Sequence, residues 1–282
     1  MVNQLKTVLL LGGLTGFLVA VGYYFGGQQG ALMALILSAV MNFGAYWFSD
    51  KMVLAMYGAK EIPATANPAL HKLVGELASE AGIPKPRIFM VNLPVPNAFA
   101  TGRDVNHAVV AVSPKILEIL ENRELKGVLA HELSHITNRD MLVSSIAATL
   151  AGAISYLAQM AYWGGALSGG RNDENRGGNT FGMLAILILT PLIATLLHLA
   201  ISRSREFGAD ESGAKLSRQP LMLARALEKL DDYAKHRPLV GEPKHQATAH
   251  LFIVNPFKAD LLTSLFSTHP PVQERVKRLE AM

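Results

Sequence analysis

The pentapeptide His131-Glu132-Leu133-Ser134-His135 decides the expected fold and chemistry of this chain. It falls inside an apolar helical pattern, so the two histidines, four residues apart, share one helix face. Two imidazoles placed in this way can bind one metal ion, and Glu132 can take a proton from a water on that ion. The competing interpretation is a pair of structural histidines around a surface glutamate. Because the preceding residues are apolar, we expect both histidines to face a buried cleft.

A two-histidine metal site needs a third ligand and an open fourth position. The candidate region is 202–210, where Glu206 and Asp210 are four residues apart on a helical pattern and project together. One of these carboxylates can bind the metal while the other accepts a hydrogen bond from a ligand histidine. The alternative is a solvated helix face on which Arg203 and Arg205 pair with the two acids.

Long runs without charged residues dominate the rest of the chain. No Asp, Glu, Lys or Arg occurs between Lys6 and Asp50, in 141–170 or in 177–202, and 50% of the residues are hydrophobic. The glycine-rich segment 26–30 divides the first run, so we expect about four transmembrane helices in two hairpins, each crossing taking about 20 residues. A cleaved signal peptide is the competing interpretation of the first crossing. The predicted parts are a transmembrane hairpin (1–50), a first catalytic part (51–140), a second hairpin (141–202) and a second catalytic part (203–282).

The charges indicate where the catalytic parts lie. Lys6, Lys51 and Lys60 flank the first predicted hairpin, whereas its turn is uncharged. Because basic residues tend to stay in the cytoplasm, we expect a multi-pass protein of the inner membrane whose catalytic parts face the cytoplasm. The net charge of +4 is spread over surfaces of mixed sign and indicates no nucleic-acid partner. The chain has no cysteine, which excludes disulfides and thiolate metal ligands.

The water-facing parts combine helices with a few short strands. Apolar spacing predicts helices over 68–82, 117–137, 219–235 and 272–280, and strands over 87–91 and 107–112. The expected fold is therefore mainly α (α+β), with a small β-sheet beside the transmembrane helices.

Four separated motifs resemble the M48 family of membrane zinc peptidases. They are the pentapeptide followed by Arg139-Asp140, the run Arg205-Glu206-Phe207-Gly208-Ala209-Asp210, the run Asn97-Ala98-Phe99-Ala100-Thr101-Gly102, and Thr268-His269-Pro270-Pro271. The likeness covers nearly the whole chain. It implies a gluzincin-like zinc peptidase domain with one zinc ion, held by His131, His135 and Glu206. It also implies that Glu132 is the general base and that Asp210 supports a ligand histidine.

The same resemblance implies residues that contact substrate. His269 and Arg275 resemble a pair that approaches the substrate carbonyl, where they would stabilise the oxyanion. The alternative for His269 is a helix-start residue before two prolines. Asn97, Ala98, Phe99 and Ala100 would form an edge strand to which an extended peptide adds, although Asn97 can also simply shape a turn.

These features predict a membrane-bound zinc endopeptidase. The catalytic helix runs almost directly into the third predicted crossing, so its active site should lie near the bilayer surface, with lipid and polypeptide substrates as partners. The family resemblance implies a role in protein quality control and stress response, with misfolded or damaged membrane proteins as substrates. One alternative is a specific processing peptidase of membrane-associated or lipidated proteins. Another is a non-catalytic membrane protein with a structural metal site.

Overall fold

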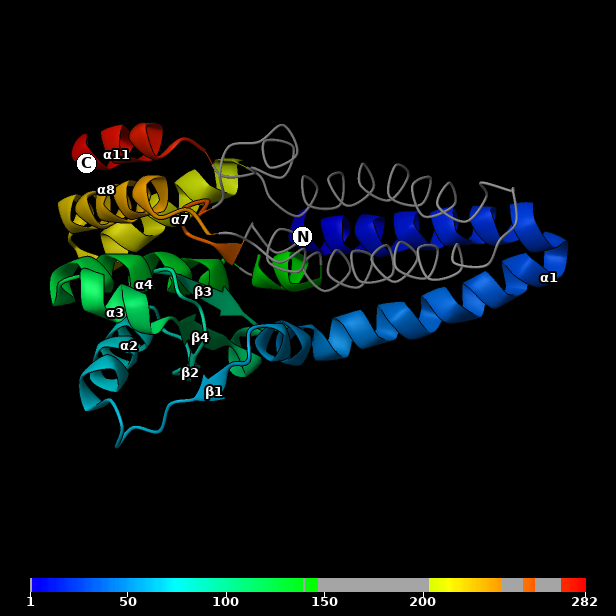
Figure 1. Ribbon diagram of the computed structural model, residues 1–282, viewed down its shortest axis with the longest axis horizontal. Helices are drawn as coiled ribbons and strands as arrows, with labels where there is room; N and C mark the ends of the chain where they lie inside the picture. Colours follow the sequence, from blue (N-terminus) through cyan, green and yellow to red (C-terminus); the bar gives the residue numbers. More distant parts are fainter. Residues whose placement is uncertain (1, 139, 147–202, 240–250, 257–269) are drawn as a thin grey trace, which may run out of the picture.

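The computed structural model describes residues 2–138, 140–146, 203–239, 251–256 and 270–282. It shows the predicted catalytic half, which is rich in helices, at one end and a long helical hairpin at the other (Figure 1). His269 and most of the predicted second transmembrane hairpin lie outside the described residues.

The N-terminal helix α1 (Val2–Met56) folds back on itself, as the predicted first hairpin requires (Figure 1). The reversal occurs at Gly27, whose non-helical angles (φ 58°, ψ −147°) are accessible to glycine without steric cost. Asn42 Nδ2 donates a hydrogen bond to Thr15 Oγ1 at 2.9 Å, which joins the two arms. The predicted turn within 26–30 is therefore confirmed in position, but it is a sharp helical kink and not an open loop.

α1 carries the apolar surface expected of a membrane segment. Among the described residues, all exposed large hydrophobic side chains except Leu221 and Met282 lie on this helix. Its arm Gly26–Met56 has 31 residues and contains an 18-residue window with a mean hydropathy of 1.7, so it is long and apolar enough to cross a bilayer. The apolar helix Leu11–Tyr24 of the other arm is shorter. The described residues thus contain one segment that meets the length and hydropathy of a crossing, where the sequence predicts four in the whole chain.

A small mixed sheet forms one side of the catalytic half. Its strands are β1 (Lys60–Glu61), β2 (Arg87–Met90), β3 (Ala98–Thr101) and β4 (Val109–Val112), in the order β1-β2-β4-β3. β2 and β4 are parallel, and both outer pairs are antiparallel. Within the described part of the chain, β3 is therefore an edge strand with one side free of a partner strand.

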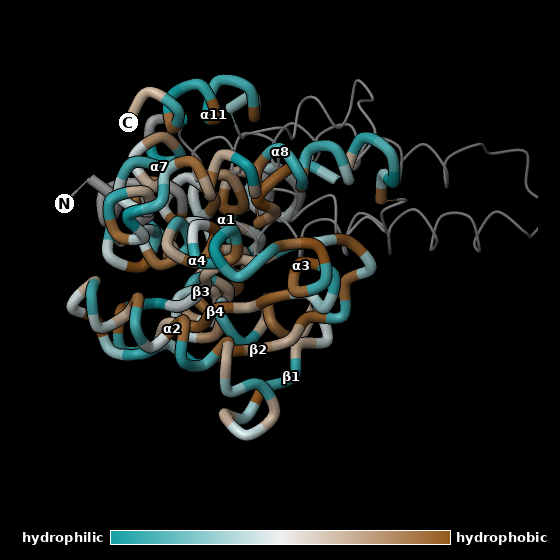
Figure 2. Tube along the Cα trace, turned by 90° about the vertical axis from the view of Figure 1, so that its left-hand side faces the viewer, coloured by the Kyte–Doolittle hydropathy of each residue, from teal (hydrophilic) through white to brown (hydrophobic). Residues whose placement is uncertain are grey.

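Helices cover this sheet in successive layers. Going away from the sheet and α2, both views show α4, then α7 with α8, and then α11 outermost (Figures 1 and 2). α11 is mostly hydrophilic in Figure 2, as an outer helix should be. The bounds are α2 Pro68–Glu80, a 3₁₀ turn η1 Val105–His107, α3 Pro114–Ile119, α4 Asn122–Thr137, α7 Arg203–Ser217, α8 Pro220–His236 and α11 Val272–Glu280.

The two predicted catalytic parts share one hydrophobic core. Val128 and Leu133 of α4 pack in the same buried cluster as Leu227 of α8 and Val276 of α11. Segments separated by the second predicted hairpin therefore fold as one unit, which brings α4 beside α7.

The predicted helix over 117–137 is wrong in one respect, because the structure has two helices there. Leu120 is extended (φ −91°, ψ 135°) and ends α3. The Glu124 carboxylate accepts a hydrogen bond from the Glu121 backbone N–H at 2.9 Å, which starts α4. Apolar periodicity continues through this break and cannot reveal it. The other predicted helices and strands are confirmed within two residues at each end.

Candidate metal centre

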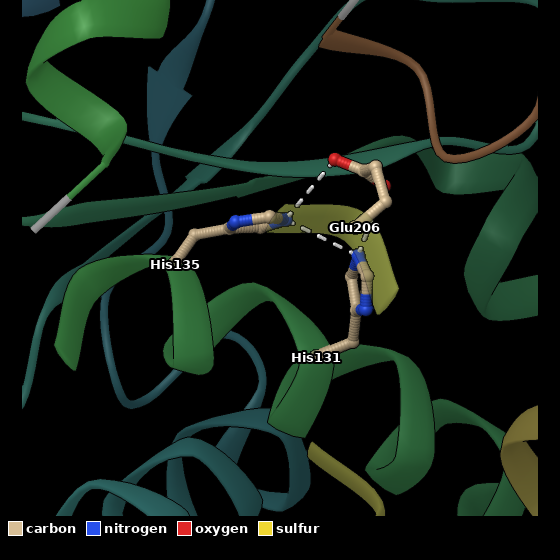
Figure 3. Close-up of side chains that lie close together, drawn as sticks. All are labelled: His131, His135 and Glu206. Atoms are coloured by element: carbon tan, nitrogen blue, oxygen red, sulfur yellow. Dashed lines mark hydrogen bonds and ion pairs between the residues drawn. The ribbon is translucent and has the colours of Figure 1, made fainter. Parts of the chain in front are cut away.

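Three side chains from α4 and α7 converge on one point (Figure 3). His131 and His135 come from α4, and Glu206 comes from the first turn of α7. The two Nε2 atoms are 3.2 Å apart, and Glu206 carboxylate oxygens lie 3.8 Å from that of His131 and 3.7 Å from that of His135. A tetrahedral ion with bonds of about 2.0–2.2 Å keeps its ligand atoms about 3.3–3.6 Å apart. The three residues therefore fit a divalent metal ion.

A close helix contact brings Glu206 to the histidines. Gly213 of α7 packs against the backbone of α4, where a Cβ atom would lie 2.7 Å from both N and Cα of His131. Only glycine permits this approach. Glu206 lies seven residues, or two helical turns, before Gly213 and so shares its face toward α4.

His131 is held by Asp210, which lies one turn after Glu206 on α7. The distance from His131 Nδ1 to Asp210 Oδ1 is 2.9 Å, which leaves Nε2 for a metal ion. Arg275 of α11 makes a bidentate contact with the same carboxylate, in which Nε and Nη2 donate hydrogen bonds at 2.8 Å and 2.7 Å. Burial would raise the pKa of Asp210, but the Arg275 guanidinium lowers it to about 2. Asp210 is therefore ionised at neutral pH.

His135 has a carboxylate partner of its own, Asp140. Its two oxygens lie 3.2 Å and 3.1 Å from His135 Nδ1. Burial would lower the pKa of His135, but the charges of Asp140, Glu206 and Glu132 raise it to about 10. The sequence places Asp140 next to the pentapeptide motif without indicating its role. The sequence feature that could have revealed this contact is the position of Asp140 just beyond the end of α4, whose last turn carries His135.

Glu132 follows His131 on α4 and lines the same cleft. Its Oε2 accepts a hydrogen bond from the backbone N–H of Ala100 in β3 at 3.0 Å, which fixes the carboxylate. Burial raises the pKa of Glu132. A carboxylate with a raised pKa binds a proton more readily, which suits a general base.

The cleft is lined by β3 and by the segment 251–253 as well as by the metal-binding group. Asn97, fully buried just before β3, joins these two linings. Its Nδ2 donates to the backbone oxygen of Leu251 at 3.2 Å, and its Oδ1 accepts from the N–H of Ile253 at 3.1 Å. Asn97 thus holds the segment 251–253 beside β3.

Arg275 occupies a different place from that implied by the family resemblance. Its side chain is fully buried, and Nη1 donates to the backbone oxygen of Ile253 at 3.1 Å while the rest of the guanidinium binds Asp210. It does not line the cleft. Its Nη2 also lies 3.5 Å from His131 Nε2, and its Nη1 lies 3.8 Å from Glu206 Oε2. Because the buried guanidinium contacts Asp210, His131 and Glu206, this geometry favours a positioning role over contact with substrate. His269, its predicted companion, lies outside the described residues.

The fold and the site together define a class. A helix carrying a buried glutamate and two histidines that could bind a metal ion, together with a carboxylate from a second helix, is the arrangement typical of a metallopeptidase. The chain belongs to peptidase family M48, whose model matches residues 64–282. Family membership supports a metal-dependent peptidase and disfavours the non-catalytic alternative.

Relatives extend the match over the full length. Proteins described as "Protease HtpX homolog" are 54% identical in Sulfurihydrogenibium sp. (100% of this chain, 97% of the relative) and 53% identical in Persephonella marina (99% and 97%). The one from Pyrococcus furiosus is 52% identical over 97% of this chain and 94% of its own. The crystal structure of S. mikatae Ste24p has the same fold, with a TM-score of 0.53 at 20% identity, over 99% of this chain and 65% of that one. The chain is therefore a membrane metalloprotease.

Proposed function

We propose that the protein is a zinc-dependent endopeptidase that hydrolyses polypeptides presented at the cytoplasmic face of the inner membrane. The observation that carries this proposal is the convergence of His131, His135 and Glu206 beside the buried carboxylate of Glu132. The donor set of two imidazoles and one carboxylate suits zinc and leaves a coordination position open for catalysis.

The chain's own residues have distinct tasks in this proposal. When bound, zinc would polarise the peptide carbonyl and lower the pKa of a water molecule to roughly 7. Glu132, oriented by the Ala100 N–H, accepts the proton of the attacking water and delivers it to the departing amine. Asp210 and Asp140 keep the two ligand histidines in the orientation that exposes Nε2.

The edge strand supports a polypeptide substrate. Among the described residues no strand pairs with the side of β3 that faces away from β4, and on that side the Ala100 N–H orients Glu132. An extended peptide can add beside such a strand through main-chain hydrogen bonds, which do not depend on its sequence. We therefore propose that Ala98, Phe99 and Ala100 guide the substrate, while Asn97 acts indirectly by holding 251–253.

The position of the ligands supports a site near the bilayer. Asp140 immediately precedes the helical residues 141–146, at the start of the third predicted crossing, and α7 begins directly after the fourth. Both carboxylates that contact His135 thus come from segments adjoining predicted membrane helices. This arrangement supports misfolded or damaged membrane proteins as substrates, in a quality-control role.

The test compares E132Q with the wild type, both purified in detergent with zinc. E132Q should bind wild-type amounts of metal but lose cleavage of an unfolded protein, whereas E118Q, which changes an exposed carboxylate of α3, should keep it. E206A should lose metal, and E211A, an exposed position on the same helix, should not. Cleavage by metal-replete E132Q at the wild-type rate would refute the mechanism.

The substrate range decides between quality control and specific processing. A quality-control peptidase should cut many unfolded chains at several positions. Cleavage confined to one bond in a lipidated peptide, with unfolded proteins left intact, would instead identify the processing peptidase. Peptide mapping of the products by mass spectrometry separates these results.

A further inference from the structure

Arg205 lines the cleft and is positively charged, but the proposed mechanism does not use it. It precedes Glu206 on α7, and it lines the cleft together with Asp140, Met141 and Ser144. Its Nε and Nη1 atoms are buried, and no described residue accepts a hydrogen bond from either. Burial lowers the pKa of Arg205, and the negative charges of Asp140 and Glu206 partly counteract this decrease.

The contrast with Arg275 is informative. Within the described chain, Arg275 directs Nε and Nη2 to Asp210 and Nη1 to the backbone of Ile253. Arg205 has two buried donors without such acceptors, although buried polar groups normally find partners. Since Arg205 lines the cleft and Arg275 does not, a molecule entering the cleft can supply the missing acceptor only to Arg205.

The charge of the site indicates which substrate group can accept hydrogen bonds from Arg205. Four carboxylates surround the site, namely Glu132, Asp140, Glu206 and Asp210. A divalent ion and the two guanidinium groups would balance them. An acidic substrate side chain would add an uncompensated negative charge, whereas a peptide carbonyl is neutral and accepts hydrogen bonds.

We infer that Arg205 binds the substrate backbone, donating from Nε and Nη1 to a carbonyl oxygen at or beside the cleaved bond. This inference rests on the proposed function, because it needs a polypeptide in the cleft. Arg205 then serves as the substrate-binding guanidinium, the role that the family resemblance implies for Arg275. It is a sequence-independent contact, like those of the edge strand.

The test uses R205Q, with R203Q as the matched control, because Arg203 is an exposed arginine at the start of the same helix, two positions before Arg205. R205Q should lower kcat/KM for an unfolded, uncharged fluorescent peptide by roughly 10–100-fold, the loss expected when a charged hydrogen-bond donor is removed. Its bound zinc and thermal midpoint should match those of R203Q. In the inactive E132Q background, R205Q should also weaken binding of the same peptide, which a purely structural role would not do.

Several results would overturn the inference. One is equal kcat/KM for R205Q and R203Q, and another is a loss confined to peptides that contain Asp or Glu. If R205Q loses zinc or stability, R205K decides, since it keeps the charge but lacks the planar fork. R205K with full zinc and low kcat/KM supports backbone binding, whereas R205K with wild-type kcat/KM assigns Arg205 to charge balance. Cleavage by E132Q at the wild-type rate would refute the proposed function, whereas the comparison of R205Q with R203Q tests the role of Arg205 separately.

Discussion

Replacing Arg275 should weaken metal binding and stability together, although Arg275 is not a metal ligand. Its guanidinium is fully buried, and it fixes Asp210, which in turn fixes the ligand His131. Arg275→Met leaves the Asp210 carboxylate buried without its partner. Arg275→Lys keeps the positive charge, but one ammonium group cannot donate to both Asp210 oxygens and to the Ile253 backbone in the same geometry.

The magnitudes follow from these contacts. Removing one partner of a buried ion pair costs about 3–5 kcal/mol, which is the expected loss for R275M. R275K should lose about 1–3 kcal/mol, since buried acceptors remain without a donor. Disturbing the support of a ligand histidine lowers metal affinity roughly 10–100-fold. Without Arg275, burial should also raise the pKa of Asp210, so acid should release metal at a higher pH than in the wild type.

The assay combines thermal unfolding in detergent with zinc titration against a competing chelator. K277M is the matched control, because Lys277 is an exposed cation two positions further along α11. K277M should behave as the wild type in both measurements. If R275K instead binds zinc and unfolds as the wild type does, while kcat falls steeply, Arg275 serves the substrate directly and the positioning role is refuted.

Three further perturbations test other contacts of the site. N97D keeps the shape of Asn97 but replaces a donor with an acceptor, so stability should fall by about 1–3 kcal/mol in thermal unfolding; an unchanged midpoint would contradict its bridging role. G213A should cost about 1–3 kcal/mol by overpacking and weaken zinc binding in titration, whereas G208A, with open space around it, should do neither. Because the pKa of His135 is about 10 without metal, His135 is protonated at neutral pH and must lose this proton when zinc binds. Apparent zinc affinity should therefore rise about tenfold per pH unit up to about pH 10. In D140N the rise should end at lower pH, and identical calorimetric proton release in both proteins would refute this account.

The sequence predicts those features of the site that local spacing determines. Two histidines four apart, and Glu206 four residues before Asp210, define helix faces without knowledge of the fold. The bounds of α11 follow from its apolar spacing in the same way, and the hairpin turn follows from the glycines at 26–30. Each of these depends on residues within a few positions of one another.

The supporting contacts could not be predicted because they join distant segments. Nothing near Asn97 in sequence indicates that it bonds Leu251 and Ile253. The bond from Arg275 to Asp210 likewise depends on how α11 packs over α7, and family resemblance points Arg275 toward substrate instead. The break at Leu120 was missed for a different reason, since a capping interaction overrides an uninterrupted apolar pattern.

These distant contacts form one chain from the substrate cleft to the metal ligand. Asn97 and Arg275 hold the segment 251–253 by its backbone, and Arg275 continues through Asp210 to His131. The buried side chains of Leu251, Phe252 and Ile253 add packing contacts to these backbone bonds. In our proposal the cleft offers a substrate the backbone groups of β3 and the donors of Arg205, and neither contact depends on substrate sequence. We therefore expect the cleft to select for an extended backbone more than for particular residues, which is the recognition that cleavage of unfolded polypeptides requires.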